Sequence, residues 1–326
     1  ICDSGYSGDP TAGCEPIETD PCEGVQCPHG ATCVGGNCPC DPGFADDGSG
    51  GCSAEPVSDP TERTRQEVCS RWNDDYGTTA SAMWTIEPDE QCDHGVLDPG
   101  QQRDALRRLN LFRWLAGLNP VTSNADYVDK TQKCATTLAA HGRITHSITE
   151  DFPCYTSDAA TAAGSSNLAQ GVRSPASSVD LYIADRGVSS LGHRRWSLNP
   201  SMSATGFGQR DRFGCMWSFD RSGSSSVDHV FWPPPGFVPN RVIPSTWSMG
   251  SNTARFGSDL SVTVEPAGGG SSIDVSNVQR LPNGYAINTI SWSVSTRDLQ
   301  PGTEYVVTIT GAGDSPITYR ITPVDC

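Results

Sequence analysis

Residues 192–200 read Gly-His-Arg-Arg-Trp-Ser-Leu-Asn-Pro, and Gly206-Phe207-Gly208 follow shortly after. Beyond this motif the sequence changes to short alternating segments, which are typical of strands, at 204–208 and 214–219. Before it, apolar side chains recur at helical spacing, which predicts helices over 101–116, 124–141 and 176–187. The middle of the chain is therefore predicted to be an α+β domain in which helices flank a small sheet.

The 14 cysteines are distributed unevenly, because eight of them lie in the first 52 residues. This stretch is rich in Gly, Pro and Asp and poor in large aliphatic side chains, so it cannot bury enough apolar surface to fold without cross-links. The segment 2–6 (CDSGY) recurs 38 residues later as 40–44 (CDPGF), and each is followed at the same interval by a cysteine. The N-terminal part is thus predicted to contain repeats of one small disulfide-stapled module.

Composition and the alternation of apolar with polar residues define two further regions of the chain, a linker and a C-terminal domain. Residues 53–68 form a linker rich in proline and charge that runs into the next domain. Residues 241–326 alternate between apolar and polar positions with turn signals between the runs, which is typical of an all-β sandwich. The pairing of the remaining cysteines cannot be read from the sequence; they are Cys69, Cys92, Cys134, Cys154, Cys215 and Cys326.

Charge and hydropathy exclude several classes of function. The net charge of −16, with only two lysines and no polybasic block, argues against binding of nucleic acid or of an anionic membrane. No apolar run is long enough to span a membrane. An even number of cysteines favours an oxidising compartment, and so a secreted or cell-surface protein. Because the chain starts at Ile1-Cys2 without a signal-peptide pattern, we expect a processed or truncated sequence.

The order of motifs in the middle region resembles the CAP superfamily, which comprises cysteine-rich secretory proteins, antigen 5 and pathogenesis-related 1 proteins, in its bacterial secreted form. The most specific element is the 192–200 motif with the glycines that follow it. The resemblance covers about 100–220, and 69–240 with its extensions. The other matching elements are Leu109-Asn110, Arg113, Gly117-Leu118-Asn119-Pro120, His146-Ser147, Ser166-Asn167-Leu168-Ala169 and Asp180.

The resemblance implies an α-β-α sandwich with a central cleft, where two histidines and two acidic residues can hold a divalent metal. His146 and His193 match the two histidines, and Asp180 stands where the family has a glutamate on the helix before the motif. Ser166, followed by Asn167, replaces the second acidic residue, and Asp185 is a candidate substitute for it. Two imidazoles and one carboxylate could still bind Zn²⁺ with one position open, and a vestigial cleft without metal is an equal alternative.

The flanking regions resemble other extracellular modules. The cysteine spacing over 22–52 resembles an EGF-like domain, which implies the disulfides Cys22–Cys33, Cys27–Cys38 and Cys40–Cys52. By the same reading, residues 1–21 are the end of a preceding repeat closed by Cys2–Cys14. The run Leu299-Gln300-Pro301-Gly302-Thr303-Glu304-Tyr305 resembles a corner of fibronectin type III and related Ig-like domains.

These features give one favoured function and two alternatives. The favoured one is non-catalytic extracellular binding of a lipid, sterol, glycan or protein through the cleft or groove. The first alternative is a metal-dependent hydrolase or protease that acts through His146, Asp180 and His193, and the second is a purely structural surface protein. The implied partner is an extracellular ligand or a surface protein or glycan, and the sequence does not fix the oligomeric state.

Overall fold

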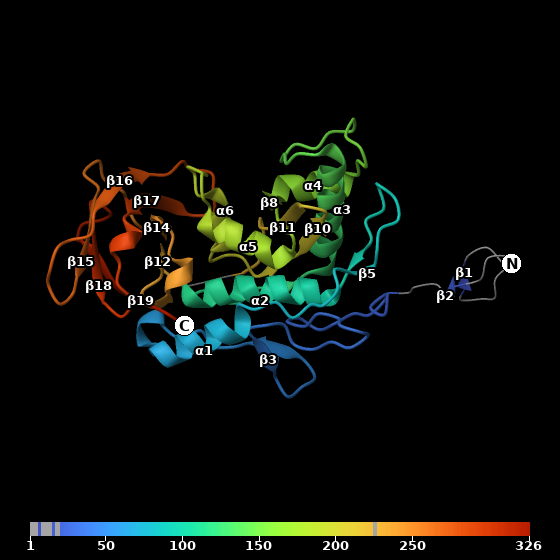
Figure 1. Cartoon of the computed structure of the whole chain (residues 1–326), viewed down its shortest axis with the longest axis horizontal. Helices are drawn as coiled ribbons and strands as arrows, with labels where there is room; N and C mark the ends of the chain where they lie inside the picture. The colour runs from blue at the N-terminus through green and yellow to red at the C-terminus, as the bar shows by residue number, and fades with distance from the viewer. Residues whose placement is uncertain (1–5, 8–14, 17–19, 224–226) are drawn as a thin grey trace.

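The computed structural model describes residues 6–7, 15–16, 20–223 and 227–326 of the chain (Figure 1). Its mixed content of helices and strands fits the predicted α+β class. Strand β1 (Tyr6–Ser7) pairs antiparallel with β2 (Glu15–Pro16). The predicted disulfide Cys2–Cys14 lies outside the described residues.

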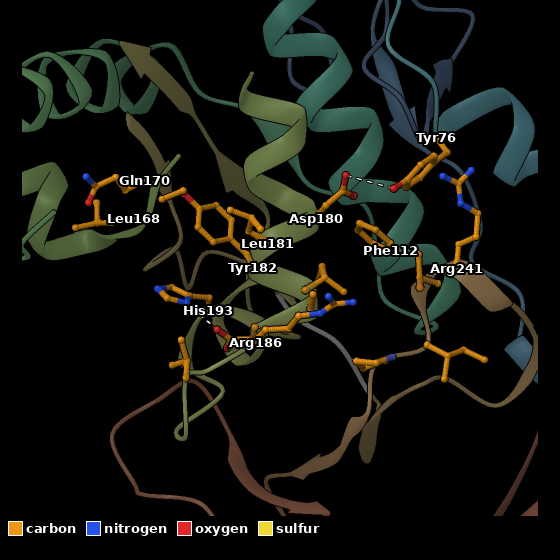
Figure 2. Close-up of a pocket in the computed structure, with 18 residues that line it drawn as sticks. Tyr76, Phe112, Leu168, Gln170, Asp180, Leu181, Tyr182, Arg186, His193 and Arg241 are labelled. Carbon is orange, nitrogen blue, oxygen red and sulfur yellow. Dashed lines mark hydrogen bonds and ion pairs between the residues drawn. The ribbon is translucent and has the colours of Figure 1, made fainter. Parts of the chain in front are cut away.

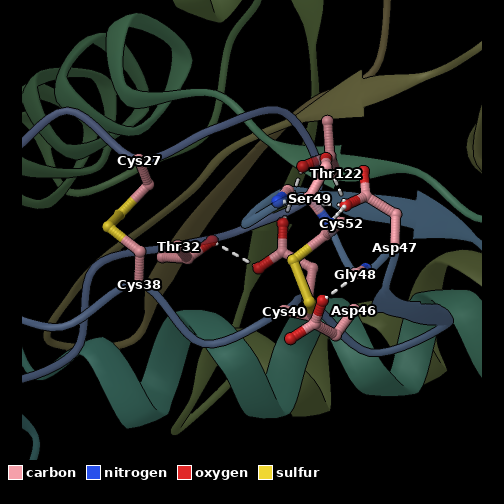
Figure 3. The surroundings of a disulfide bond; sticks show 12 residues. Cys27, Thr32, Cys38, Cys40, Asp46, Asp47, Gly48, Ser49, Cys52 and Thr122 are labelled. Carbon is pink, nitrogen blue, oxygen red and sulfur yellow. Dashed lines mark hydrogen bonds between the residues drawn. A yellow bond between two sulfur atoms is a disulfide. The ribbon is translucent and has the colours of Figure 1, made fainter.

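The N-terminal module, residues 20–54, is held by cross-links rather than by a core. Its bonds are Cys22–Cys33, Cys27–Cys38 and Cys40–Cys52, the pairs implied by the EGF-like spacing. Figure 3 shows the last two of them. Its short strands β3 (Phe44–Asp46) and β4 (Cys52–Ala54) are antiparallel. Within 20–54 only two apolar side chains, Ala31 and Phe44, are buried. Disulfides are therefore needed to offset the chain entropy lost on folding.

A buried carboxylate joins this module to the middle of the chain. Asp41, which is 1% exposed, accepts hydrogen bonds from the Thr122 hydroxyl at 2.6 Å and the Ser123 amide at 3.2 Å. Its other oxygen accepts one from the hydroxyl of Thr32 within the module (Figure 3). The Asn110 amide adds a bond of 2.7 Å to the carbonyl of Pro42. We call this set of contacts the Asp41 joint.

The predicted linker 53–68 contains regular structure in its second half. A 3₁₀ turn, η1, covers Pro60–Glu62, and helix α1 runs from Arg65 to Asp75. The helix starts inside the predicted linker because Thr64 and Glu67 form a capping box, in which each side chain accepts the other residue's amide hydrogen. The linker prediction was therefore wrong for residues 65–68.

Five more helices and a small sheet build the middle region. The helices are α2 (Pro99–Leu115), α3 (Ala125–His141), α4 (Ser157–Ser165), α5 (Pro175–Ala184) and α6 (Gly192–Ser197). Strands β8 (Ser166–Gln170), β10 (Phe207–Arg210) and β11 (Phe213–Trp217) form an antiparallel sheet in the order β10-β11-β8. Two small pairs complete the region: β5 (Trp84–Ile86) with β6 (Val96–Leu97), and β7 (Thr122–Ser123) with β9 (Ala204–Thr205).

Helices lie on both faces of this sheet. One core contains residues of α1, α2 and α5, with Ala169, Phe207 and Met216 from the strands. A second core contains residues of α3 and α4, with Leu168 and Cys215 from the strands. Successive strand residues thus divide between the two cores, as the two-residue period of a strand requires. The result is a three-layer α-β-α arrangement.

The glycines after the 192–200 motif let α3 lie directly on the sheet. A Cβ at Gly206 would come within 2.4 Å of the Val128 amide nitrogen, and one at Gly208 within 2.0 Å of the Thr131 carbonyl oxygen. No other residue type fits at either position without moving the helix. The disulfide Cys134–Cys215 then ties α3 to β11.

The C-terminal sheet pair consists of two four-stranded sheets. One has the order β12-β14-β17-β16 and the other β13-β19-β18-β15. The strands are β12 (His229–Trp232), β13 (Gly236–Pro239), β14 (Thr246–Ser251), β15 (Ser261–Pro266), β16 (Val275–Arg280), β17 (Asn288–Val294), β18 (Tyr305–Thr310) and β19 (Ile317–Val324), with 3₁₀ turns η2 (Asn240–Val242) and η3 (Thr296–Asp298).

Inner residues of both sheets form one core, among them Trp247, Trp292 and Ile321. The Tyr305 hydroxyl accepts the Gln300 amide hydrogen at 2.8 Å, which fixes the corner noted in the sequence. The predicted C-terminal region 241–326 leaves out β12 and β13, although these strands pair with β14 and β19.

Two further disulfides connect distant segments. Cys69 in α1 is bonded to Cys326 at the end of the sequence, and Cys92 is bonded to Cys154. The three pairs among the last six cysteines thus join elements that are far apart in sequence. No helix within the described ranges is long and apolar enough to cross a membrane.

Candidate binding cleft

A cleft of about 400 Å³ lies beside α5, between the middle region and the start of the C-terminal sheet pair (Figure 2). One wall is α5 with the residues that follow it. The other walls come from β8, from Phe112 of α2, from Tyr76 at the end of α1 and from the segment 241–244. The lining is largely apolar and includes Leu168, Leu181, Ile183, Val188, Val242 and Ile243.

His193 lines the cleft and is oriented by a buried carboxylate. Its Nδ1 lies 2.8 Å from Oδ1 of Asp185, which is 3% exposed. Asp185 ends α5 in the left-handed conformation, with φ of 48°, and its second oxygen accepts the amide hydrogen of Arg194 at 3.1 Å. Because a carboxylate only accepts, Nδ1 carries the proton of the neutral ring, and Nε2 is the nitrogen available to the cleft.

Asp180 also lines the cleft, but it is already paired. Its Oδ2 accepts hydrogen bonds from Arg108 at 2.6 Å and from the Tyr76 hydroxyl at 3.3 Å. The Arg108 guanidinium also lies over the Tyr76 ring, 3.6 Å from its centroid. Burial raises the pKa of Asp180, and the nearby Arg108 opposes that rise. Figure 2 shows the Asp180 carboxylate directed towards Tyr76, with His193 elsewhere along the cleft.

Two exposed arginines, Arg186 and Arg241, stand at the rim of the cleft. Neither forms an ion pair with another described residue, although Arg241 lies 5.9 Å from the Tyr76 ring centroid. Arg108 is paired with Asp180, and the buried Asp185 is bonded to His193 and to the Arg194 amide. Arg186 and Arg241 are therefore left as positive charges at the rim, in a chain of net charge −16. Such a rim attracts an anionic group, while the apolar walls accept a hydrocarbon body.

Of the five residues predicted for the site, only Asp180 and His193 line this cleft. His146 Nδ1 bonds to the carbonyl of Ala163 at 2.8 Å. Ser166 is 1% exposed, and its hydroxyl has no hydrogen-bond partner within the described part of the chain. Asn167 donates to the His193 carbonyl at 2.9 Å, so it holds β8 to α6. Ser166 and Asn167 are neighbours in a strand and point to opposite faces, so they cannot both face one cleft.

The implied divalent metal does not fit these residues. Among the described residues, no group of three or more His, Cys, Asp or Glu side chains is placed to hold a metal ion. Oδ2 of the Asp180 carboxylate is already bonded to Arg108, which leaves only Oδ1 without a hydrogen-bond partner among the described residues. His193 and Asp180 therefore share a cleft without forming a metal centre together with His146.

The sequence interpretation missed most of the charged residues around the cleft. Asp185 was recognised only as a substitute for the missing acidic residue. Tyr76, Arg108 and Arg241 carry no motif and come from distant parts of the chain. Only the fold brings them to one place.

Comparison with known proteins supports the interpretation of the middle region. Residues 106–230 match the model of the cysteine-rich secretory protein family, CAP. The match covers less than half of the chain and contains α5, Asp185 and His193, but not the cleft segment 241–244. Neither a curated protein nor a solved structure matches the chain. A CAP domain and the six disulfides among the described residues are consistent with an extracellular protein.

Proposed function

We propose that the chain is a secreted, non-catalytic protein of the CAP superfamily that binds a small amphipathic anion in the cleft beside α5. This proposal rests mainly on one observation: the cleft combines apolar walls with two arginines at its rim that have no ion-pair partner among the described residues. Of the ligand classes considered, a lipid-like molecule with an acidic head fits this lining best. A glycan would need more hydrogen-bonding groups than the walls offer.

The flanking modules fit an extracellular role. We assign residues 1–21 and 22–52 to EGF-like repeats of a spacer or adhesion type, and 53–64 to a linker that ends where α1 begins. The CAP-like domain then covers 65–228, and an Ig or fibronectin-III-like sandwich that includes β12 and β13 covers 229–326. We also propose that the chain belongs to the bacterial secreted type of the superfamily. The disulfide-stapled N-terminal module supports an oxidising, extracellular location.

Leu181→Glu is expected to weaken binding of a fluorescent long-chain carboxylate about tenfold. Leu181 is 49% exposed on the cleft side of α5, so the change places a charge against the hydrocarbon body with little effect on folding. The measurement is a fluorescence titration, with the methyl ester as a neutral comparison ligand. Ile144→Glu is the matched control, because Ile144 is 40% exposed and lies away from the cleft. Equal affinity in wild type and Leu181→Glu would contradict the proposed site.

Binding of a permanently ionised ligand should depend on the charge of Asp180. Burial raises the pKa of Asp180 above its usual value, so the carboxylate takes up a proton as the pH falls towards 4, while the arginines stay charged. A fluorescent alkyl sulfonate should therefore bind about threefold more tightly at pH 4 than at pH 7, the size expected for one partly screened charge. Asp180→Asn should bind tightly at both values. A pH-independent affinity in the wild type would contradict the assignment.

The hydrogen bond between Asp185 and His193 also favours a second candidate function, hydrolysis with His193 as general base. This replaces the metal-dependent scheme, because Asp180 and His146 do not join His193 in a metal centre. Fluorogenic ester and peptide libraries would decide between the two functions. Turnover that His193→Ala abolishes would favour the hydrolase, and its absence together with ligand binding would favour the binding protein.

A further inference from the structure

One wall of the cleft comes from outside the stretch that matches the CAP family model. Residues 241–244 line the cleft opposite α5, and β14 of the C-terminal sheet pair begins two residues after them, at Thr246. Arg241, one of the rim arginines, belongs to this wall. The cleft is therefore incomplete without the segment that joins β13 and β14 of the sheet pair.

Arg194 of the 192–200 motif ties this sheet pair to the end of α5. Its side chain is 1% exposed and makes hydrogen bonds in two directions. Nε donates to the Ile183 carbonyl at 2.7 Å and one terminal nitrogen to the Ala184 carbonyl at 3.0 Å. The other terminal nitrogen donates to the Thr246 carbonyl at 2.9 Å and the Ser248 hydroxyl at 3.2 Å, both in β14. A planar guanidinium can make all four contacts at once, and a lysine cannot.

The α5 side of this contact is adjacent to the histidine of the cleft. The carbonyls that Arg194 holds belong to the two residues before Asp185, the partner of His193. The backbone amide of Arg194 donates to Asp185 as well. Burial lowers the pKa of Arg194 to about 10 and the charge of Asp185 opposes this, so the guanidinium remains charged at neutral pH beside that carboxylate.

The next residue makes a parallel contact that does not reach the histidine. Arg195 is also buried and donates to carbonyls of the sheet-pair segment 282–287, at 2.9 Å to Pro282, 3.1 Å to Tyr285 and 2.7 Å to Ile287. On its own side it contacts only the Ser190 carbonyl, at 3.3 Å. The two arginines are therefore similar in burial and in the number of hydrogen bonds. They differ in that Arg194 holds the backbone next to Asp185, whereas Arg195 holds the Ser190 carbonyl.

We infer that the C-terminal sheet pair is a working part of the cleft and that Arg194 is the positioning residue through which its docking holds Asp185 against His193. The inference rests on the proposed function in giving the cleft a ligand, but the Arg194 contact itself is independent of any ligand. Because coupling between binding and docking is reciprocal, a ligand in the cleft also strengthens the contact between β14 and the end of α5.

Arg194→Lys and Arg195→Lys, compared in the full chain, test this role. A histidine Nδ1–H donated to a buried carboxylate exchanges slowly with solvent and is visible as a downfield proton signal in NMR. The His193 signal, assigned through its loss in His193→Ala, should be present in the wild type and in Arg195→Lys. It should be absent, or exchange at least about tenfold faster, in Arg194→Lys. An unchanged signal in Arg194→Lys would overturn the inference.

A milder pair of variants decides the question if Arg194→Lys does not fold. Ser248→Ala removes one contact of Arg194 on the sheet-pair side, whereas Ser291→Ala changes the buried residue paired with Ser248 in the next strand and makes no contact with Arg194. Exchange of the His193 proton at least about threefold faster in Ser248→Ala than in Ser291→Ala supports the inference, and equal rates overturn it.

Titration of the wild type with the long-chain carboxylate is a separate measurement. Absence of binding there contradicts the proposed function, while the proton signal still decides the role of Arg194.

Discussion

Replacement of Arg113 by methionine is expected to lower the free energy of unfolding by about 4 kcal/mol. Arg113 is fully buried in α2 and forms no ion pair with a carboxylate of the described residues. Its guanidinium instead donates to four carbonyls, at 2.9 Å to Asn119, 3.0 Å to Ser197 and Asn199, and 3.1 Å to Met202. Methionine fills similar space but donates to none of them, so each of the four acceptors would lose a hydrogen bond in a dry interior, and the Asn199 carbonyl would keep only the amide hydrogen of Met202.

Removal of the buried charge partly offsets this loss. Burial lowers the pKa of Arg113 to about 9, with the charge of Asp220 opposing the change, so the folded state does carry a desolvation cost. The loss of four hydrogen bonds outweighs it. The measurement is denaturant unfolding followed by tryptophan fluorescence, with Arg173→Met as the control, because Arg173 is exposed and its side chain makes no hydrogen bond with the described residues. A loss below about 1 kcal/mol for Arg113→Met would show that methionine repacks the site.

Removal of the Cys69–Cys326 disulfide, by serine at both positions, is expected to cost about 5 kcal/mol in the chain-entropy model. The bond closes a loop with a sequence separation of 257, and the lost constraint acts mainly on the unfolded chain. In the folded state it anchors the end of the chain, just after β19, to α1. The sheet pair should therefore loosen before the middle region does.

Calorimetry of the double-serine variant measures the loss. The matched control replaces Cys92 and Cys154, whose sequence separation is 62, and the same model predicts a loss of about 4 kcal/mol. Hydrogen exchange in β19 should increase only in the Cys69 and Cys326 variant. Unchanged exchange in β19, together with a small calorimetric loss, would mean that hydrogen bonds and packing alone hold the sheet pair in place.

Much of the fold could be predicted because its determinants are local. The helices over 101–116 and 124–141 were expected close to their observed ends, since apolar spacing and terminating glycines are properties of neighbouring residues. The capping box of Thr64 and Glu67 is also a local sequence pattern, but the prediction of a linker over 53–68 did not take it into account. The N-terminal disulfides could be inferred only through the resemblance to an EGF-like domain, because six cysteines by themselves allow about 15 pairings.

Long-range contacts could not be predicted in this way. The pairs Cys69–Cys326, Cys92–Cys154 and Cys134–Cys215 join elements whose proximity depends on how the layers pack. The cleft depends on packing in the same manner. Asp180 and His193 both line the cleft, but no pattern in the sequence shows that Arg108 would pair with Asp180.

The Asp41 joint has a mechanical consequence. One carboxylate oxygen of Asp41 holds strand β7, and the neighbouring carbonyl of Pro42 is held by Asn110 in α2. The N-terminal module is therefore attached at two points rather than at one. A pull on that module would be transmitted into the long helix that lies under the cleft instead of being absorbed by a hinge. The N-terminal module then acts as a stiff stalk, which sets the orientation in which the cleft is presented.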